Sequence, residues 1–227
     1  MSNTSYFILA FAEATFEDRT MSLGPRKVPQ QQRARATCDA ILQAAAHIIG
    51  RQGLVGFNTN AVAERAGVSI GSLYQYFPNK DALMAALIER QQEQQLATLT
   101  TAAALIGSGD SLESVVRALV RAAMQHHRDD DLLASAIDHE EARLPMARVL
   151  GDFLERGGAI VEKLLMQRSD VARSIDPCLA ARTLPALVRA ITDAWANLTP
   201  PQLDIAEDEA VRAVLGYLGQ PVRSQNP

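Results

Sequence analysis

Two short helical runs separated only by Gly67–Val68 constrain this chain more than any other feature. The first run covers Thr59–Ala66 and the second Ser69–Tyr76. Isolated helices shorter than about 12 residues are marginal in water, so both must pack against a further helix. That helix is expected from Arg35 onward, where apolar residues recur with a helical period at Ile41, Ala44, Ala45 and Ile48. The pattern predicts a compact three-helix unit with a helix-turn-helix.

Turn and cap residues support this arrangement. Gly67 can adopt the positive φ that a tight turn between helices requires, and Gly53 offers a left-handed end to the preceding helix. Ser69 and Asn79 suit the N-caps of the helices that follow them. A small core is expected from Phe57, Val62, Ala63, Val68, Leu73 and Phe77.

The second short helix would project side chains suited to duplex DNA. Small residues near its start let the backbone approach base edges, and later residues offer hydroxyl and amide groups. Ile70 cannot hydrogen-bond to a base and would contact a thymine methyl at most. Taken singly, Tyr74 and Tyr76 could be ordinary half-buried aromatics, but the ordered set favours DNA binding. The candidate DNA-binding residues are Thr59, Asn60, Ser69, Ile70, Gly71, Ser72, Tyr74, Gln75, Tyr76 and Lys80.

The charge distribution agrees with a polyanionic partner for this part of the chain alone. Residues 81–227 contain 14 basic and 21 acidic side chains, a net charge of −7. Residues 21–80 contain seven basic side chains against Asp39 and Glu64, a net charge of +5. A basic N-terminal third joined to an acidic body indicates that only the former contacts nucleic acid.

The run AGVSIGSLYQYFPNK at 66–80 resembles the DNA-binding signature of the TetR family of bacterial repressors. The resemblance covers residues 35–95 strongly, and the remainder of the chain only in its helical plan. It implies a nine-helix subunit in two parts, a two-fold homodimer and a palindromic DNA operator. By position, Ser69–Phe77 would be the recognition helix and Asn60 would occupy a place that reads bases in some members. Ile70, Gly71, Ser72, Tyr74 and Gln75 would then face the major groove, with Thr59, Tyr76 and Lys80 on phosphates.

The rest of the chain also reads as helical, with no strand-like alternation. After a long helix over 80–105 and a loop at 107–110, helices are expected near 111–127, 131–142, 146–168, 177–197 and 205–219. Pro177 suits a first helical turn capped by Asp176, and Asp204 and Glu207 have the spacing of a capping box. We therefore expect an all-α chain with a flexible segment at 1–32, a helix-turn-helix domain at 35–95 (motif 58–77) and a ligand-binding and dimerisation domain at 96–220.

Two sets of apolar residues in the C-terminal part are candidates for binding roles, with simple core packing as the alternative for both. The family resemblance implies that the last two helices pair in the dimer, and the middle helices would enclose a small, hydrophobic effector. The candidate interface residues are Leu184, Leu187, Val188, Ile191, Trp195, Val211, Val214, Leu215 and Leu218. The candidate effector-binding residues are Met124, His127, Ile137, Met146, Phe153 and Leu164.

Other functional classes have less support. The polar residues between His126 and Glu141 could bind a divalent metal ion in an enzyme, but such runs usually coat a turn and stay solvated. A helical adaptor without DNA binding is a further alternative. We expect no catalytic activity, cofactor or metal, and no apolar run reaches the roughly 18 residues of a membrane span. Cys38 and Cys178 are expected as free thiols in a cytoplasmic protein, and Met21 is a possible alternative start.

Overall fold

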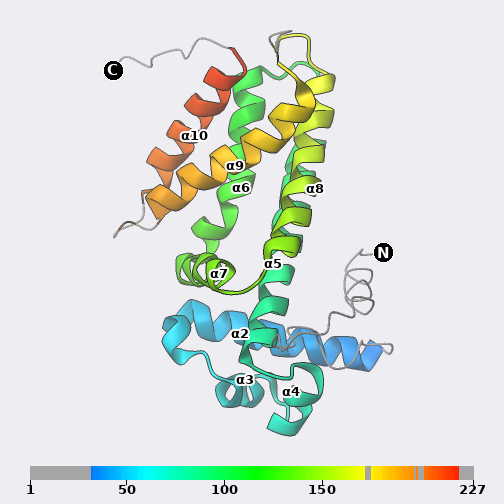
Figure 1. Cartoon of the computed structure of the whole chain (residues 1–227), viewed down its shortest axis with the longest axis vertical. Coiled ribbons are helices and arrows are strands. Elements are labelled where there is room, and N and C mark those ends of the chain that lie inside the picture. Colours follow the sequence, from blue (N-terminus) through cyan, green and yellow to red (C-terminus); the bar gives the residue numbers. More distant parts are fainter. Residues whose placement is uncertain (1–31, 172–174, 197, 199–201, 220–227) are drawn as a thin grey trace. The chain divides into compact units, whose positions relative to one another are not determined.

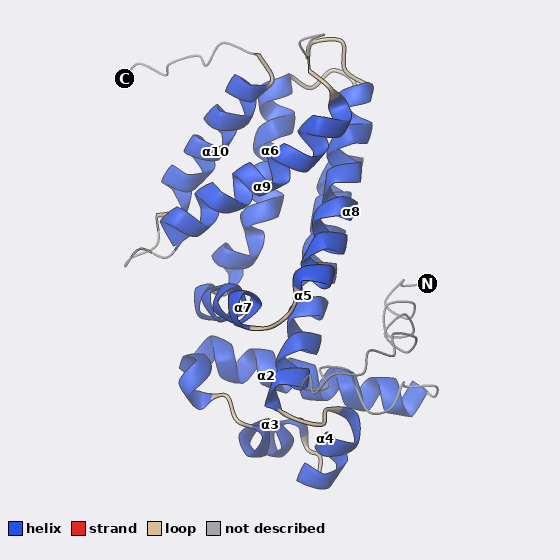
Figure 2. Ribbon diagram, in the orientation of Figure 1, coloured by secondary structure: helices blue, strands red, loops and turns tan. Residues whose placement is uncertain are grey.

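The computed structural model describes residues 32–171, 175–196, 198 and 202–219, so almost all of the predicted flexible segment at 1–32 lies outside the described residues. Across these ranges the chain forms nine α-helices and no strand, which confirms the predicted all-α class (Figure 2). The described residues form two compact units. The first runs to Glu93 and adds Leu132–Met146, and the second comprises Gln94–Asp131 and the chain from Ala147.

The first unit contains the predicted three-helix arrangement. Its helices are α2 (Gln32–Gly56), α3 (Thr59–Ala66), α4 (Ile70–Tyr76), the beginning of α5 (Lys80–Ala104) and α7 (Asp131–Arg143). The short helix α3 packs against α2, and α4 packs against α3 (Figure 1). Their apolar side chains meet in a core that includes Ile41, Ile49, Phe57, Val62, Leu73, Phe77 and Leu83, each at most 2% exposed.

The predicted turn at Gly67 and the caps at Ser69 and Asn79 are confirmed, whereas Gly53 forms a kink within α2, which continues to Gly56 instead of ending there. Gly67 has a φ of 68° between α3 and α4, and Gly53 has a φ of 63° within α2. Both values lie in the left-handed region that side chains disfavour. Ser69 Oγ accepts from Ser72 N at 3.0 Å, and Asn79 Oδ1 accepts from Ala82 N at 2.7 Å. These caps determine where α4 and α5 begin.

The second unit is a helical body around a separate core. It contains α6 (Leu112–Asp129), α8 (Ala147–Met166), α9 (Pro177–Ala196), α10 (Leu203–Tyr217) and the last part of α5. Helix α10 packs along α6 and α9 (Figure 1). The buried core includes Val116, Val120, Met124, Leu184, Val211 and Leu218. Among the described helices, none is long and apolar enough to span a membrane.

Helices α8 and α9 approach each other closely at a glycine. A Cβ atom on Gly158 would lie 2.6 Å from the carbonyl oxygen of Ala181, which is closer than real Cβ contacts. The absence of a side chain at Gly158 therefore allows this helix crossing.

The start of α9 follows the prediction, whereas the start of α10 does not. Asp176 Oδ1 accepts from Cys178 N at 2.9 Å and caps α9, whose first residue is Pro177. The predicted capping box of Asp204 and Glu207 is wrong, because α10 begins after Gln202 and no side chain caps it.

Glu207 instead binds arginines of α6. Its Oε1 accepts from Arg117 at 3.0 Å and from Arg121 at 2.8 Å, and its Oε2 accepts from Arg128 at 3.1 Å. Glu207 is only 5% exposed, and charge-assisted bonds to guanidinium groups outweigh the local cap. The same Arg128 also binds Asp204 at 2.9 Å.

Candidate nucleic-acid interface

Helix α4 presents one uncharged face, with both polar and apolar side chains, to solvent. Leu73 is fully buried, whereas Ile70 and Tyr74 are each 38% exposed. Gly71 and Gln75 are exposed beside them. These four residues recur with the i, i+4 spacing of one helix face, so α4 is held by its inner side and is accessible along its outer side.

A hydrogen bond joins this face to the start of α3. The hydroxyl groups of Tyr74 and Thr59 lie 3.1 Å apart, and either can donate. Helix α3 is itself capped by Asn58, whose Oδ1 accepts from Ala61 N at 2.9 Å. The sequence pattern did not single out Asn58, although its residue type before the predicted helix is a typical N-cap signal.

A lysine at the start of α5 lies next to an aromatic ring. Lys80 Nζ is 4.9 Å from the centroid of the Phe57 ring, within the range of a cation–π interaction. Phe57 is buried, so the ring holds its position, while Lys80 remains exposed. An ammonium group restrained in this way can contact a phosphate as a point charge.

The predicted DNA-binding residues all lie in the first unit. Thr59, Ser72 and Tyr76 are half-buried, and the rest are exposed: Asn60, Ser69, Ile70, Gly71, Tyr74, Gln75 and Lys80. The hydroxyl of Ser69 is occupied in the cap and lies 2.8 Å from that of Ser72. Arg65, in the last turn of α3, adds an exposed cation that motif spacing alone did not indicate.

The candidate dimer residues fall into two groups within the second unit. Leu187, Val188, Ile191 and Trp195 on α9 are half-buried. The others belong to the core of the same chain: Leu184, Val211, Val214, Leu215 and Leu218. A side chain buried in its own core cannot offer the same area to a partner, so only the half-buried group leaves apolar surface for a second subunit.

The candidate effector-binding residues are divided between the units. Met124, His127, Phe153 and Leu164 lie in the second unit, and Ile137 and Met146 lie in the first. Met124 and His127 are buried, whereas Phe153 and Leu164 are half-buried.

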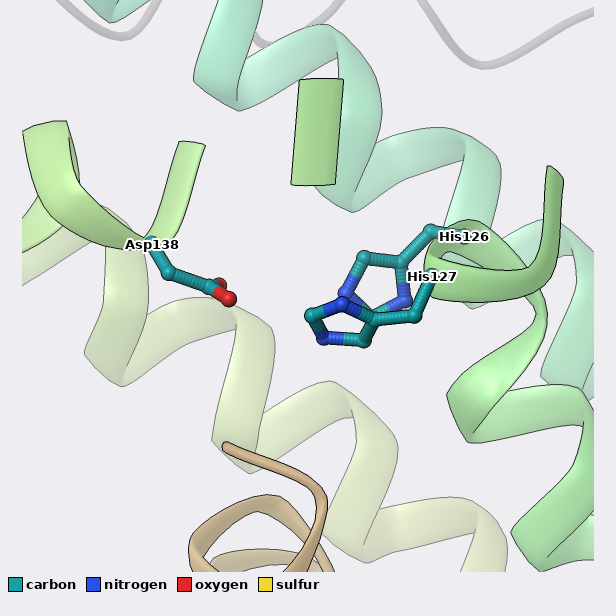
Figure 3. A group of neighbouring side chains, drawn as sticks. All are labelled: His126, His127 and Asp138. Carbon is teal, nitrogen blue, oxygen red and sulfur yellow. The ribbon is translucent and has the colours of Figure 1, made fainter. Parts of the chain in front are cut away.

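Helix α6 carries two adjacent histidines near its C-terminal end. The ring centroids of His126 and His127 are 4.0 Å apart (Figure 3). Burial disfavours the imidazolium form and lowers the pKa of His126 to about 3 and that of His127 to about 4, with the charge of Arg189 acting in the same direction. The expectation that this polar run stays solvated is therefore wrong for His127, which is 3% exposed. Asp138, also drawn in Figure 3, belongs to α7 of the first unit.

A half-buried glutamine lies next to His126. Gln95 Nε2 donates to the carbonyl oxygen of Ala123 at 2.6 Å and lies 3.4 Å from His126 Nδ1. Within either unit taken by itself, no three described His, Cys, Asp or Glu side chains come together as metal ligands.

Both cysteines are free thiols, as predicted. Burial and the neighbouring Asp39 raise the pKa of the Cys38 thiol to about 11, so it is protonated at neutral pH.

Comparison with known proteins agrees with this geometry. Residues 41–87 match the family described as "Bacterial regulatory proteins, tetR family", and residues 111–218 match the "Tetracyclin repressor-like, C-terminal domain". The HTH-type transcriptional regulator Rv2250c of Mycobacterium tuberculosis is 30% identical over 78% of this chain and 92% of its own. The HTH-type transcriptional repressor KstR of Mycolicibacterium smegmatis is 28% identical over 80% of this chain and 88% of its own.

Solved structures show the same fold. A TetR-family regulator from Mesorhizobium loti superposes with a TM-score of 0.67 at 21% identity, covering 83% of this chain and 98% of that one. The helix-turn-helix with its exposed α4, the two matching family regions and the relatives that share most of their length lead to one assignment. The chain belongs to the TetR family of bacterial transcriptional regulators.

Proposed function

We propose that this chain is a ligand-responsive repressor that binds a palindromic operator as a homodimer and is released by a small hydrophobic effector. The observation that carries the proposal is the solvent-accessible face of α4, next to the restrained Lys80. A helix held on its inner side and exposed on its outer side suits insertion into the major groove. The description of KstR as a repressor supports repression rather than activation.

In this proposal the exposed residues divide into two roles. Ile70, Gly71, Ser72, Tyr74 and Gln75 face the bases, and Thr59, Tyr76 and Lys80 contact phosphates. Asn60 and Ser69 flank these contacts, and Arg65 adds positive charge on α3. Phosphate contacts position the protein, whereas base contacts specify the sequence.

Two copies of the chain are needed to read both halves of a palindrome. Their recognition helices must lie about 34–36 Å apart to enter successive major grooves on one face of the DNA. The half-buried residues Leu187, Val188, Ile191 and Trp195 of α9 leave apolar surface that a second copy can cover. We assign the dimer contact to this half-buried face of α9.

The effector is proposed to bind the second unit, near Met124, His127, Phe153 and Leu164. It would favour a form of the dimer in which the two recognition helices no longer match the groove spacing. A coupling of about 1–3 kcal/mol would change operator affinity by about 5- to 150-fold.

This role requires binding alone, so we assign no catalytic step to the chain and place its action in the cytoplasm with bacterial DNA. The two alternatives, a metal-dependent enzyme and a helical adaptor, lack the support that α4 gives to DNA binding.

Selection from a random library of duplex DNA tests the proposal. Purified full-length protein should enrich two inverted half-sites. Its affinity for them should fall steeply as the salt concentration rises, because lysine and arginine side chains that bind phosphates displace counterions from the DNA. Lys80→Ala should reduce the slope of log K against log salt by about 1 per subunit, whereas Lys163→Ala, an exposed lysine of α8, should not. Enrichment of no sequence at moderate salt would refute the proposal.

A further inference from the structure

The outer face of α4 has an unusual chemistry for a helix that binds a polyanion. The seven residues of α4, Ile70–Tyr76, include no charged side chain. Arginine and lysine are the side chains that most often read guanine, through its O6 and N7 atoms. The face that would lie against the bases therefore has no group for the commonest guanine contact.

Most of the hydroxyl groups on α4 already have partners within the protein. The Tyr74 hydroxyl lies 3.1 Å from Thr59 Oγ1, and the Ser72 hydroxyl lies 2.8 Å from Ser69 Oγ. The exposed amide of Gln75 is then the side chain best placed to form two new hydrogen bonds with one base. A glutamine amide matches the N6 and N7 atoms of adenine in the major groove.

The residue one turn before Gln75 provides room for this contact. Side chains on a helix lean toward its N-terminus, so Gln75 lies over the position of Gly71. Gly71 is exposed, and a Cβ atom there would meet only Ser69 Oγ, at 3.9 Å. With no side chain at Gly71, the backbone of α4 can approach the base edges and bring the Gln75 amide within reach.

Ile70 adds an apolar contact on the same face. Its side chain is 38% exposed at the first position of α4, where it would otherwise remain in water. The C5-methyl group of thymine is the apolar feature of the major groove that an aliphatic side chain can cover.

We propose that α4 reads A·T base pairs, with the Gln75 amide on an adenine and the Ile70 side chain on a thymine methyl group of each half-site. This inference rests on the proposed function, because it requires α4 to lie in the major groove. It specifies the bases at the contacted positions of each half-site and the residue that contacts each of them.

Site selection with a charged variant tests the role of Gln75. The wild-type protein should select adenine at one position of each half-site, preferred over guanine by about 5- to 150-fold. Gln75→Arg should select guanine at that same position. The matched control is Gln43→Arg, which adds the same charge at an exposed site of α2 and should leave the selected bases unchanged.

Replacing thymine by deoxyuridine in the selected operator tests Ile70 without altering the protein. This removes one methyl group per base and should weaken wild-type binding by about fourfold at the contacted position. Ile70→Ala, which keeps only the Cβ methyl group, should show a smaller difference between the two operators than the wild-type protein does. Equal wild-type affinity for both operators would overturn the assignment of Ile70.

The outcomes separate failure of the proposed function from failure of the inference about base contacts. If the wild-type protein selects no duplex sequence, both the proposed function and this inference fail. If it selects inverted half-sites but Gln75→Arg changes no base, or changes the same bases as Gln43→Arg, the proposed function stands and this inference is wrong.

Discussion

The hydroxyl group of Tyr74 on α4 lies 3.1 Å from the hydroxyl group of Thr59 at the start of α3. This contact joins the two helices of the helix-turn-helix on their exposed side, whereas Leu73 and Val62 join them through the core. It restrains the Tyr74 ring on the face proposed to meet DNA. Binding then costs less side-chain entropy, because the ring is already ordered.

We predict that the two hydroxyl groups act as one unit in DNA binding. Thr59→Val and Tyr74→Phe each remove one hydroxyl and keep the shape of the side chain. Affinity for the selected operator should fall in each variant, and the double variant should lose less than the sum, with an interaction energy of about 0.5–1.5 kcal/mol. Binding titrations of the four proteins measure this energy, and strictly additive losses would show that the bond has no role in recognition.

The close approach of α8 and α9 predicts a penalty for a single methyl group. Gly158→Ala would place Cβ 2.6 Å from the backbone oxygen of Ala181, which can move only with its helix. Unfolding in urea should show a loss of about 1–3 kcal/mol. Gly151→Ala on the same helix is the control, because no atom lies within 4 Å of its Cβ, and it should gain about 0.5–1 kcal/mol. Similar changes in both variants would contradict the predicted close packing.

The buried carboxylate of Glu207 predicts a second stability effect. Glu207→Gln leaves three guanidinium groups facing a neutral amide, although the side chains of Arg117, Arg121 and Arg128 are 29%, 63% and 31% exposed and partly screened. The free energy of unfolding should fall by about 1–3 kcal/mol. Glu209→Gln, which removes the surface pair with Arg212, should cost less than about 0.5 kcal/mol. The prediction fails if denaturant midpoints shift equally in the two variants.

The two adjacent histidines of α6 predict a loss of stability in mild acid. Their pKa values in the folded chain are about 3 for His126 and about 4 for His127, whereas the ordinary value is 6.5. The unfolded chain therefore takes up protons as the pH falls below about 6.5, before the folded chain does. Their contribution is fully present above that pH and declines below it, by at most about 2.7 kcal/mol per pH unit for the pair.

Urea unfolding between pH 7 and pH 5 measures this decline. The double variant His126→Gln/His127→Gln should show a shallower loss, since its carboxylates still titrate but the buried imidazoles do not. Parallel pH profiles for the two proteins would mean that the histidines do not remain neutral in the folded chain.

Local patterns were sufficient to predict much of the fold. The helices near 59–66 and 131–143, the positive φ of Gly67 and the cap at Asn79 depend on residues within one or two turns of each other. Their sequence signals therefore carry nearly all the information that sets them.

Contacts between residues far apart in the sequence determine the features that local patterns did not predict. Glu207 matched a local capping box, but arginines 79 to 90 residues away bind it more strongly. The apolar stripe of α10 looks the same whether it meets its own core or a partner subunit, and Val211 and Leu218 prove to be core residues. The polar run at His127 resembled a solvated turn, because burial by other helices leaves no trace in the local sequence.

Equilibrium binding of the selected operator by Gln75→Ala and Gln43→Ala tests the central claim most directly. Both replace an exposed glutamine of the first unit, one on α4 and one on α2, so their melting temperatures should match. If the outer face of α4 lies against the bases, Gln75→Ala should weaken binding by about 5- to 150-fold and Gln43→Ala by less than about twofold. Equal affinity of both variants and the wild-type protein would contradict the claim that the Gln75 amide on the outer face of α4 reads a base.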